Sequence, residues 1–283
     1  MPSFAGRYKD FSISGETFEL WEAPGGRYRF TYPVPENLAP YYDSGAYLSH
    51  HSEEAGLVPA LYRLLRRVNT AWKIRLIKQY VQPPESRIKA LDFGCGTGHF
   101  AQACIRAGWQ TTGVETDQDA AAAAAAHNGL DVYRSLEELK HDSGFDVITA
   151  WHVLEHVPQP RRTLADFHRR LAPGGIALIA VPNFSSFDAQ FYDTTWAGYD
   201  VPRHLHHFTP GFLEELAVGQ GFRPVALHRM LLDAFFVSLL SEQYSGSGPA
   251  GSLRAALTGL RSNLHALKNP RKCSAFVSVF QKV

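Results

Sequence analysis

The chain has 283 residues, 45% of them hydrophobic, which is enough for one large core with an appended region. Its formal net charge of +1 argues against a nucleic-acid partner held through charge. The three cysteines form an odd set, no apolar run reaches the length of a membrane span, and the N-terminal residues lack the apolar core of a signal peptide. We therefore expect a cytoplasmic protein with free thiols and no membrane span.

Residues 1–83 are predicted to form an extension outside the main fold. Alternating segments at 18–21 and 28–32 flank a glycine turn at 23–26 and predict a β-hairpin. The hairpin has no cysteine and its turn offers no ligand atoms, so we expect a structural flap that binds no metal. A helix is expected over 57–80, ended by Pro83-Pro84. Its predicted apolar side is formed by Leu61, Leu64, Leu65, Val68, Trp72, Leu76 and Ile77.

Residues 89–119 carry the most informative pattern in the chain. An apolar strand leads into a glycine-rich turn, a helix and a second strand that ends in an acid. The turn runs from Gly94 to Gly98, and glycine is needed where backbone must approach a ligand closely. Glu115 follows Gly94 by about the twenty residues expected of an acid that binds a ribose. The pattern predicts half of a doubly wound nucleotide-binding fold.

The same turn separates two classes of cofactor. A dinucleotide-binding turn would read G-x-G-x-x-G/A, but His99 occupies the third small position here and disfavours a nicotinamide-dependent oxidoreductase. The observed G-x-G-x-G resembles the first motif of the class I S-adenosylmethionine-dependent methyltransferases. The resemblance implies that Glu115 takes the cofactor's ribose hydroxyls. It also implies a set of residues around its methionine end, namely Asp92, Gly94, Cys95, Gly96 and Gly98.

The elements that follow repeat the order strand, helix, strand. An alanine-rich helix at 120–126 precedes short strands at 132–133 and 145–150. A basic amphipathic helix then leads through the turn 173–175 into a buried strand at 176–181. A loop-rich stretch at 182–210, a helix at 210–219 and strands at 224–227 and 275–280 complete the chain. The segments WHVLEHV and LAPGG are similar to the fourth- and fifth-strand region of the same family.

The resemblance runs from about residue 87 to the C-terminus. It implies an α/β fold with a doubly wound, mostly parallel seven-stranded sheet, a Rossmann-like methyltransferase domain at 84–283 behind the N-terminal hairpin-helix extension. A C-terminal helical insertion at 231–271 begins with a strongly apolar segment. The insertion is expected either to cover the substrate or to form a homodimer surface.

Polar residues follow the predicted strand at 145–150, at the sheet edge where open α/β folds bind ligands. The resemblance places Trp151 and His152 beside the cofactor. For His152 the sequence leaves open a catalytic role and a structural hydrogen bond to a loop carbonyl. Glu155 and His156 are expected to cap or pack the following helix.

The segment 196–210 reads WAGYDVPRHLHHFTP, and its WxxxDxPRHLxxF pattern resembles a methyltransferase subgroup that includes quinone-biosynthesis-like enzymes. We expect Tyr199, Asp200 and Arg203 to position an acidic or phenolic substrate. His204 or His207 is the expected base, because the pKa of histidine lies closest to the working pH. The alternative is that Asp200 and Arg203 have a structural role and form an ion pair that holds the loop in place. A metal at His204, His206 and His207 is disfavoured, since adjacent residues rarely point at one ion.

These patterns favour an S-adenosylmethionine-dependent methyltransferase that acts on a small molecule, with oxygen as the expected acceptor. The alternative is a non-catalytic cofactor-binding or assembly protein with the same fold. The intact acids Asp92 and Glu115 beside a histidine-rich loop argue for the enzyme. The acceptor itself does not follow from the sequence, because acceptor pockets are built from loops grafted on the fold.

Overall fold

The computed structural model describes residues 1–42, 57–81, 88–127, 129–139 and 143–283. The chain divides into two compact units, and neither is continuous in sequence. Unit 1 comprises residues 1–43, 151–164 and 179–280; unit 2 comprises residues 44–150, 165–178 and 281–283. This division follows packing, and the sequential domains at 1–83 and 84–283 stay a prediction.

An antiparallel sheet in unit 1 is formed by β1 (Ser3–Lys9), β2 (Thr17–Glu22), β3 (Tyr28–Tyr32) and β9 (His206–Phe208). Strands β2 and β3 are the predicted hairpin, which is confirmed. Strands β1 and β9 were not predicted. Because β3 pairs with β9, Arg29 lies opposite His207. The hairpin is thus hydrogen-bonded to the histidine-rich segment.

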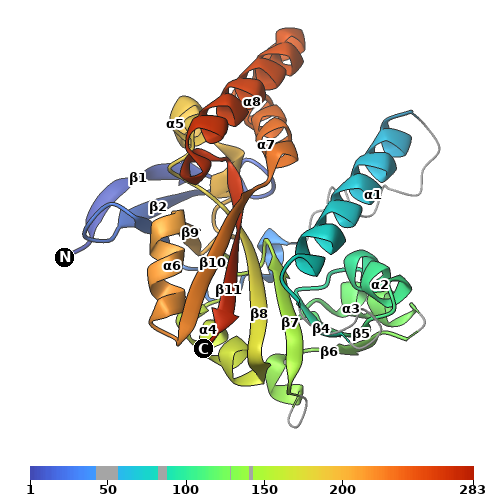
Figure 1. Ribbon diagram of the computed structural model, residues 1–283. Coiled ribbons are helices and arrows are strands. Elements are labelled where there is room, and N and C mark those ends of the chain that lie inside the picture. Colours follow the sequence, from blue (N-terminus) through green and yellow to red (C-terminus); the bar gives the residue numbers. More distant parts are fainter. Residues whose placement is uncertain (43–56, 82–87, 128, 140–142) are drawn as a thin grey trace. The chain divides into compact units, whose positions relative to one another are not determined.

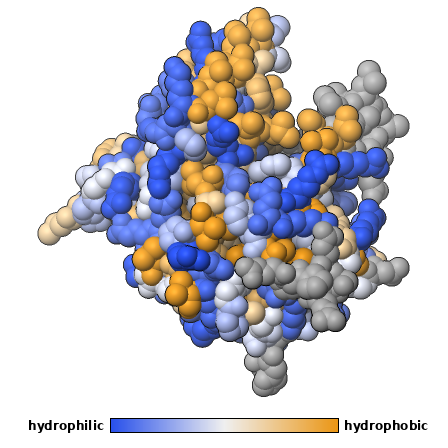
Figure 2. Space-filling model, viewed as in Figure 1, coloured by the Kyte–Doolittle hydropathy of each residue, from blue (hydrophilic) through white to orange (hydrophobic). Residues whose placement is uncertain are grey.

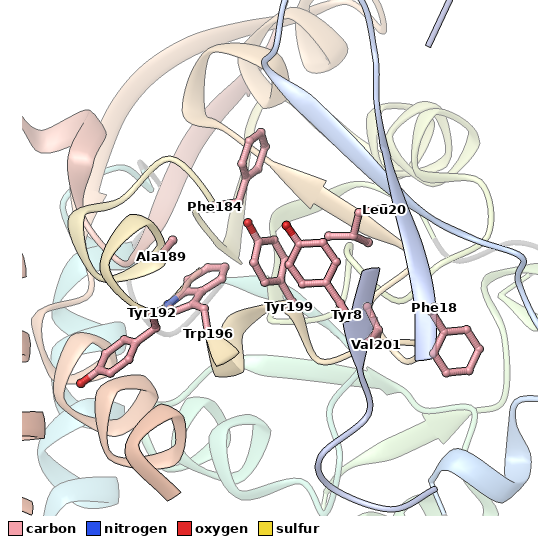
Figure 3. Packing of buried hydrophobic residues seen from close by; sticks show 9 residues of the cluster. All are labelled: Tyr8, Phe18, Leu20, Phe184, Ala189, Tyr192, Trp196, Tyr199 and Val201. Carbon is pink, nitrogen blue, oxygen red and sulfur yellow. The ribbon is translucent and has the colours of Figure 1, made fainter. Parts of the chain in front are cut away.

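The side chains beneath this sheet explain why the first strands fold as they do. Phe18 and Leu20 alternate with exposed or half-exposed residues on β2, and both are buried. They pack with Tyr8, Trp196 and five further residues into the cluster drawn in Figure 3. The core of unit 1 therefore joins the N-terminal strands to the segment 184–201.

The second sheet has seven strands in the order β10-β11-β8-β7-β4-β5-β6. Their bounds are β4 (Lys89–Phe93), β5 (Gln110–Val114), β6 (Asp131–Tyr133), β7 (Phe145–Trp151), β8 (Leu171–Pro182), β10 (Phe222–Arg229) and β11 (Ala275–Lys282). Strand β4 pairs in parallel with β5 and β7, and β5 pairs in parallel with β6. The predicted doubly wound, mostly parallel sheet is confirmed (Figure 1). Strand β8 begins five residues earlier than expected and includes the turn residues 173–175.

Three helices belong to unit 2, α1 (Leu57–Lys78), α2 (His99–Arg106) and α3 (Gln118–Ala125). All three were predicted. In α1, Leu76 and Ile77 are buried as expected, whereas Leu64, Leu65 and Val68 are exposed. The side chain of Leu61 lies outside the described residues. Helical periodicity shows which residues share a face, but it does not show that a partner covers that face.

The remaining helices are α4 (Pro160–Arg170), α5 (Phe187–Tyr192), α6 (Pro210–Val218), α7 (Leu231–Tyr244) and α8 (Gly251–Lys268). Helix α5 was missed in the stretch predicted as loop. The insertion is a helical hairpin of α7 and α8 (Figure 1). None of the helices in the described part of the chain is long and apolar enough to cross a membrane. The three cysteines are buried free thiols, as expected.

Candidate functional site

The glycine turn after β4 adopts the conformation that its residues permit. Gly94, Gly96 and Gly98 have φ values of 72°, 53° and 78°, in the left-handed region where side chains are disfavoured. A Cβ at Gly98 would lie 2.9 Å from the His127 ring and 3.0 Å from the Ala124 Cβ, so packing alone requires glycine there. A Cβ at Gly96 would meet no described atom within 4 Å. Gly96, unlike Gly98, therefore has room for a ligand.

Glu115 lies directly after β5 and reaches back to this turn. Its carboxylate accepts hydrogen bonds from the backbone N–H of Gly96 at 2.8 Å and of Asp117 at 3.0 Å. Asp117 in turn caps α3 by accepting from the backbone N–H of Ala120. A carboxylate has about four lone-pair sites, so Glu115 keeps acceptor capacity for the hydroxyls of a ligand.

Asp92 lies on β4 with only 3% of its surface exposed. Burial raises the pKa of its carboxyl from 3.8 to about 6, although the Thr149 hydroxyl donates a hydrogen bond to it at 2.7 Å. Cys95, the next side chain of the predicted cofactor set, is also buried, and burial raises the pKa of its thiol. Cys95 is therefore a neutral side chain that fills the space against Gly113.

Replacing Asp92 by asparagine is expected to stabilise the protein at neutral pH. Because the pKa of Asp92 is higher in the folded than in the unfolded chain, its contribution is fully present below pH 3.8 and is lost as the pH rises through about 6. A shift of this size corresponds to an upper limit of about 3 kcal/mol in the free energy of unfolding. Urea unfolding at pH 5 and pH 8 checks it, with Asp131→Asn on exposed β6 as the control. An equal or lower stability of the Asp92 variant at pH 8 would contradict the expected cost of ionising this carboxylate.

Trp151 and His152 lie where β7 ends, in unit 1. His152 has a φ of 57°, which is uncommon for a residue with a side chain and is often found at functional positions. Its Nε2 lies 2.9 Å from Asp233 and its Nδ1 lies 3.5 Å from Glu155. Burial lowers the pKa of His152, but its interactions with Asp233 and Glu155 outweigh burial and raise the pKa to about 10. His152 is a cation at neutral pH.

Glu155, His156 and His204 form a compact cluster in unit 1. Each offers a ligand atom, and these atoms lie within 4.8 Å of one another. Glu155 is 1% exposed, and its carboxylate oxygens accept no hydrogen bond from the described residues within normal distance. Its pKa is lowered even though burial opposes ionisation, because the cationic ring of His152 favours the charged form. Burial lowers the pKa of His156 to about 4, which leaves this ring neutral.

The ring orientations in this cluster follow from their carbonyl partners. His156 places Nδ1 at 3.0 Å from the Arg203 carbonyl, and His204 places Nδ1 at 3.0 Å from the Gly198 carbonyl. A carbonyl only accepts, so both Nδ1 atoms carry the proton and the lone pair is on Nε2 in the neutral ring. Such lone pairs can accept a proton or bind a divalent cation. The sequence disfavoured a metal site formed by His204, His206 and His207. The cluster of Glu155, His156 and His204 is a different set, and the two sets share only His204.

His207, the other predicted base, is 4% exposed. Its Nε2 lies 3.1 Å from the Thr31 hydroxyl on β3, and its ring packs edge-on against Tyr199 at 5.4 Å between centroids. Burial holds its pKa well below the usual value. His207 is therefore a neutral, buried ring whose Nε2 contacts Thr31.

The predicted substrate-positioning residues are tied into a buried network. Arg203 is 3% exposed and binds both carboxylate oxygens of Asp200, with its Nε at 2.9 Å. It also donates to the Tyr41 carbonyl at 2.8 Å and lies 3.4 Å from Asp10 after β1. Tyr199 is buried and its hydroxyl accepts from Arg29 at 2.9 Å. The ion pair considered for Asp200 and Arg203 is present, and their contact with substrate stays a prediction.

Two hollows in unit 1 differ greatly in size. One, lined in part by Asp10, Asp200 and Arg203, has a volume of about 10 Å³ and holds at most one water molecule. The other has a volume of about 550 Å³, within the usual range for a small-molecule pocket. Its lining includes Tyr28, Arg161, Arg162, His206, Phe212 and Leu216. Aromatic, aliphatic and cationic groups therefore meet in the larger hollow.

Several of these residues carry no signal in the sequence. Asp10 lies 193 residues before Arg203, and Asp233 lies 81 residues after His152. The sequence indicated Glu155 and His156 only as capping or packing residues. The repeated histidine in WHVLEHV, with a glutamate between, was the available signal that these side chains form a site.

Comparison with known proteins adds independent information. Residues 64–227 match a family described as methyltransferase domain. Two relatives carry the name ubiquinone biosynthesis O-methyltransferase. The one from Psychrobacter arcticus is 31% identical over 151 residues, 47% of this chain and 58% of the relative. The one from Methylococcus capsulatus is 35% identical over 131 residues, 42% of this chain and 55% of the relative. The chain thus spans less than two thirds of the length of either relative.

A solved structure of an S-adenosylmethionine-dependent methyltransferase from Archaeoglobus fulgidus is also similar. It has a TM-score of 0.52 and 19% identity, and the match covers 77% of this chain and 94% of that chain. At this identity the likeness bears on the fold alone. It agrees with the mostly parallel α/β fold described above.

Proposed function

The chain belongs to the methyltransferase domain family, and from this premise we propose that it transfers the methyl group of S-adenosylmethionine to an oxygen atom of a small molecule. The glycine turn carries this proposal most directly. Open space at Gly96 and the carboxylate of Glu115 beside it fit a nucleoside whose ribose hydroxyls need acceptors. Oxygen is supported by the O-methyltransferase names of the relatives.

Asp92, the glycine turn and Glu115 would hold the cofactor, which supplies an electrophilic methyl group when bound. The protein must then align an acceptor and, for a hydroxyl, remove its proton. Alignment contributes roughly 7 to 11 kcal/mol to such reactions. A positioned base contributes about a hundredfold to ten-thousandfold in rate. Loss of a base is therefore measurable even where alignment supplies most of the rate.

His204 is the base that we propose. Its Nδ1 proton is donated to the Gly198 carbonyl, which fixes the ring and leaves the Nε2 lone pair to accept a proton. His207 has its Nε2 engaged by Thr31, which favours a positioning role. His152, protonated beside Glu155 and Asp233, would attract an acidic or phenolic oxygen rather than take its proton. Trp151 beside it would complete the cofactor set that the family resemblance implies.

The acceptor is proposed to be a small acidic or phenolic molecule, with neither a nucleic acid nor a metal required. Net charge of +1 and the cationic groups Arg161 and Arg162 in the larger hollow support an anion of limited size. The three free thiols support a reducing compartment, and we propose the cytoplasm. Incubation with methyl-labelled cofactor and a panel of phenols and carboxylic acids tests the reaction. Tight binding of S-adenosylhomocysteine without transfer to any acceptor would favour the non-catalytic alternative.

Glu115→Ala is expected to weaken the binding of S-adenosylhomocysteine by about ten- to a hundredfold. Loss of a charge-assisted pair to the ribose is worth roughly 1.5 to 3 kcal/mol, and each 1.4 kcal/mol is about tenfold in affinity. Isothermal titration calorimetry measures the dissociation constant directly. Because Glu115 also binds Gly96 and Asp117, a thermal unfolding curve must show that the variant is folded.

Two comparisons make this measurement specific. Asp131→Ala removes an exposed acid from β6, two positions before its end, and should leave the affinity unchanged. Glu115→Gln keeps the acceptor oxygen but loses the charge, so its affinity should lie between those of the wild type and the alanine variant. An unchanged dissociation constant in Glu115→Ala would remove this residue from the proposed ribose site.

A further inference from the structure

In the α7–α8 hairpin the small residues are buried and large apolar residues are exposed, which is the opposite of the usual arrangement in a soluble pair of helices. The side of α8 that is buried consists of small residues, Gly251, Ala255, Thr258, Gly259, Ser262 and Ala266. The buried side of α7 includes Ala234, Ser238 and Ser241. The two backbones approach closely, since a Cβ at Gly259 would lie 2.7 Å from the Phe235 ring and 3.0 Å from its Cα. Small residues at the contact leave the large apolar side chains elsewhere.

Those large side chains point outward. Five leucines of α8 are between 48 and 67% exposed, Leu253, Leu257, Leu260, Leu264 and Leu267. They recur at intervals of four and three residues, so they form one continuous stripe along the helix. On α7, Phe235, Phe236 and Leu239 are between 37 and 48% exposed. Figure 2 shows hydrophobic surface gathered over the hairpin. A face of this size on a soluble protein indicates an interaction site.

Charged residues beside the stripe are of one sign. Arg254, Arg261 and Lys268 are exposed, seven residues apart, and each follows one of the leucines. Residues 251–272 contain no acidic residue. Both acids of α7 are engaged within unit 1: Asp233 lies 2.9 Å from His152, and Glu242 is 2% exposed and accepts from the Tyr192 hydroxyl. Arg254 lies 3.5 Å from Glu242, whereas Arg261 and Lys268 form no ion pair with the described residues. The apolar stripe is therefore bordered by a basic row that is only partly neutralised.

We propose that this hairpin docks the protein on an anionic membrane surface, with α8 lying in the plane of the interface. A leucine stripe would enter the boundary of the acyl chains, while arginine and lysine beside it would contact the headgroup phosphates. The positive row supplies attraction to anionic lipids that falls with salt. At 18 residues α8 is about 27 Å long. It lies on the bilayer, in keeping with the lack of a spanning helix among the described residues.

A second copy of the chain is a poorer occupant for the same surface. Two α8 helices packed through their leucines in antiparallel orientation would place Arg254 near Lys268 and bring the two Arg261 side chains together. Helical pairs of this kind are usually held in register by opposite charges beside the apolar seam. No acid of α8 can supply them. Charge therefore favours an anionic surface over the homodimer surface that the sequence left as an alternative.

Sedimentation of the full-length protein with vesicles tests the proposal. Phosphatidylcholine vesicles are compared with vesicles that also contain phosphatidylglycerol, at low salt and at high salt. We expect about tenfold or stronger partitioning onto the anionic vesicles at low salt, reduced at high salt. Equal partitioning onto both lipids would overturn the role of the basic row.

Three sets of substitutions separate the parts of the surface. Leu257→Gln with Leu260→Gln and Leu264→Gln should abolish binding to either lipid. Arg261→Gln with Lys268→Gln should remove the preference for anionic lipid. Val218→Gln with Val225→Gln changes two apolar residues that are 53 and 43% exposed on α6 and β10, and should bind like the wild type. Thermal unfolding and S-adenosylhomocysteine affinity report whether each variant is folded, and neither reading depends on methyl transfer.

Two results would overturn the proposal in favour of another occupant. A wild-type protein that ignores vesicles but forms a dimer in analytical ultracentrifugation, dissociated by the leucine substitutions, would assign the stripe to a second copy. A monomer that ignores vesicles and whose melting temperature falls with the leucine substitutions would show that the stripe is covered by another part of its own chain.

Discussion

Arg203→Met is expected to lower the free energy of unfolding by about 3 to 5 kcal/mol, because it leaves buried carboxylates without their cation. Arg203 is 3% exposed between Asp200 and Asp10, and Asp10 is 1% exposed. The Tyr41 carbonyl would lose its donor as well. Arg203 holds the pKa of Asp200 below its usual value despite burial, so the stabilisation is present above pH 4 and is lost as the pH falls below it. Urea unfolding at pH 7 measures the effect.

The matched control for this substitution is Arg7→Met on β1. Arg7 pairs with Glu19 at 3.7 Å but its side chain is 72% exposed, so its loss should cost less than about 1 kcal/mol. Arg203→Lys keeps the charge and separates the two roles of the residue. A stable lysine variant with a raised KM would support the contact with substrate. If Arg203→Met unfolds at the same urea concentration as the wild type, the buried network does not stabilise unit 1.

His204→Gln is expected to lower turnover by about a hundredfold or more, since it removes the Nε2 lone pair that would accept the proton. The affinity for S-adenosylhomocysteine should stay nearly unchanged, because the predicted cofactor residues lie mainly on the turn after β4 and at Glu115. Steady-state kinetics with an identified acceptor and calorimetry with S-adenosylhomocysteine measure the two quantities. A parallel fall in turnover and cofactor affinity would indicate that the segment contacts the cofactor instead.

Two further experiments test whether the histidines act as a base, stabilise the fold or bind a metal. They are the substitution His207→Gln and treatment with a chelator. His207→Gln is expected to reduce stability, through the lost contact with Thr31, more than turnover. The opposite pattern, with His204→Gln active and His207→Gln inactive, would transfer the role of base to His207. Activity that is abolished by EDTA and restored by a divalent cation would identify His204, with Glu155 and His156, as metal ligands.

The parts of the fold that the sequence predicted are those specified by local chemistry. Gly94, Gly96 and Gly98 are required by positive φ angles, and the buried part of β8 is a continuous apolar run at 176–181. In the hairpin strands β2 and β3, apolar and polar residues alternate, and the two strands flank a glycine turn. These signals lie within a few residues of the element that they specify, so one sequence is enough to read them.

Other parts of the fold depend on pairing between segments that are far apart in the sequence. Hydrophobic periodicity gives no information about such pairing. Strand β9 has only three residues and exists because β3 offers an edge to pair with. The position of Asp10 under Arg203 is set by the same sheet. Leu64 on α1 shows the other limit, because a regular apolar pattern predicted its burial whereas the side chain is exposed.

The discontinuity of unit 1 also affects how the protein is made. Strand β3 ends at Tyr32, but its partner β9 begins only at His206. A ribosome adds roughly 5 to 20 residues each second, so the first hairpin waits roughly 10 to 35 s for the strand that completes its sheet. During this interval the edge of β3 is open and Asp10 has no Arg203. A binding factor that shields the nascent hairpin would therefore act early, and strands β4 to β7, which lie within residues 89–151, can pair before the sheet of unit 1 is complete.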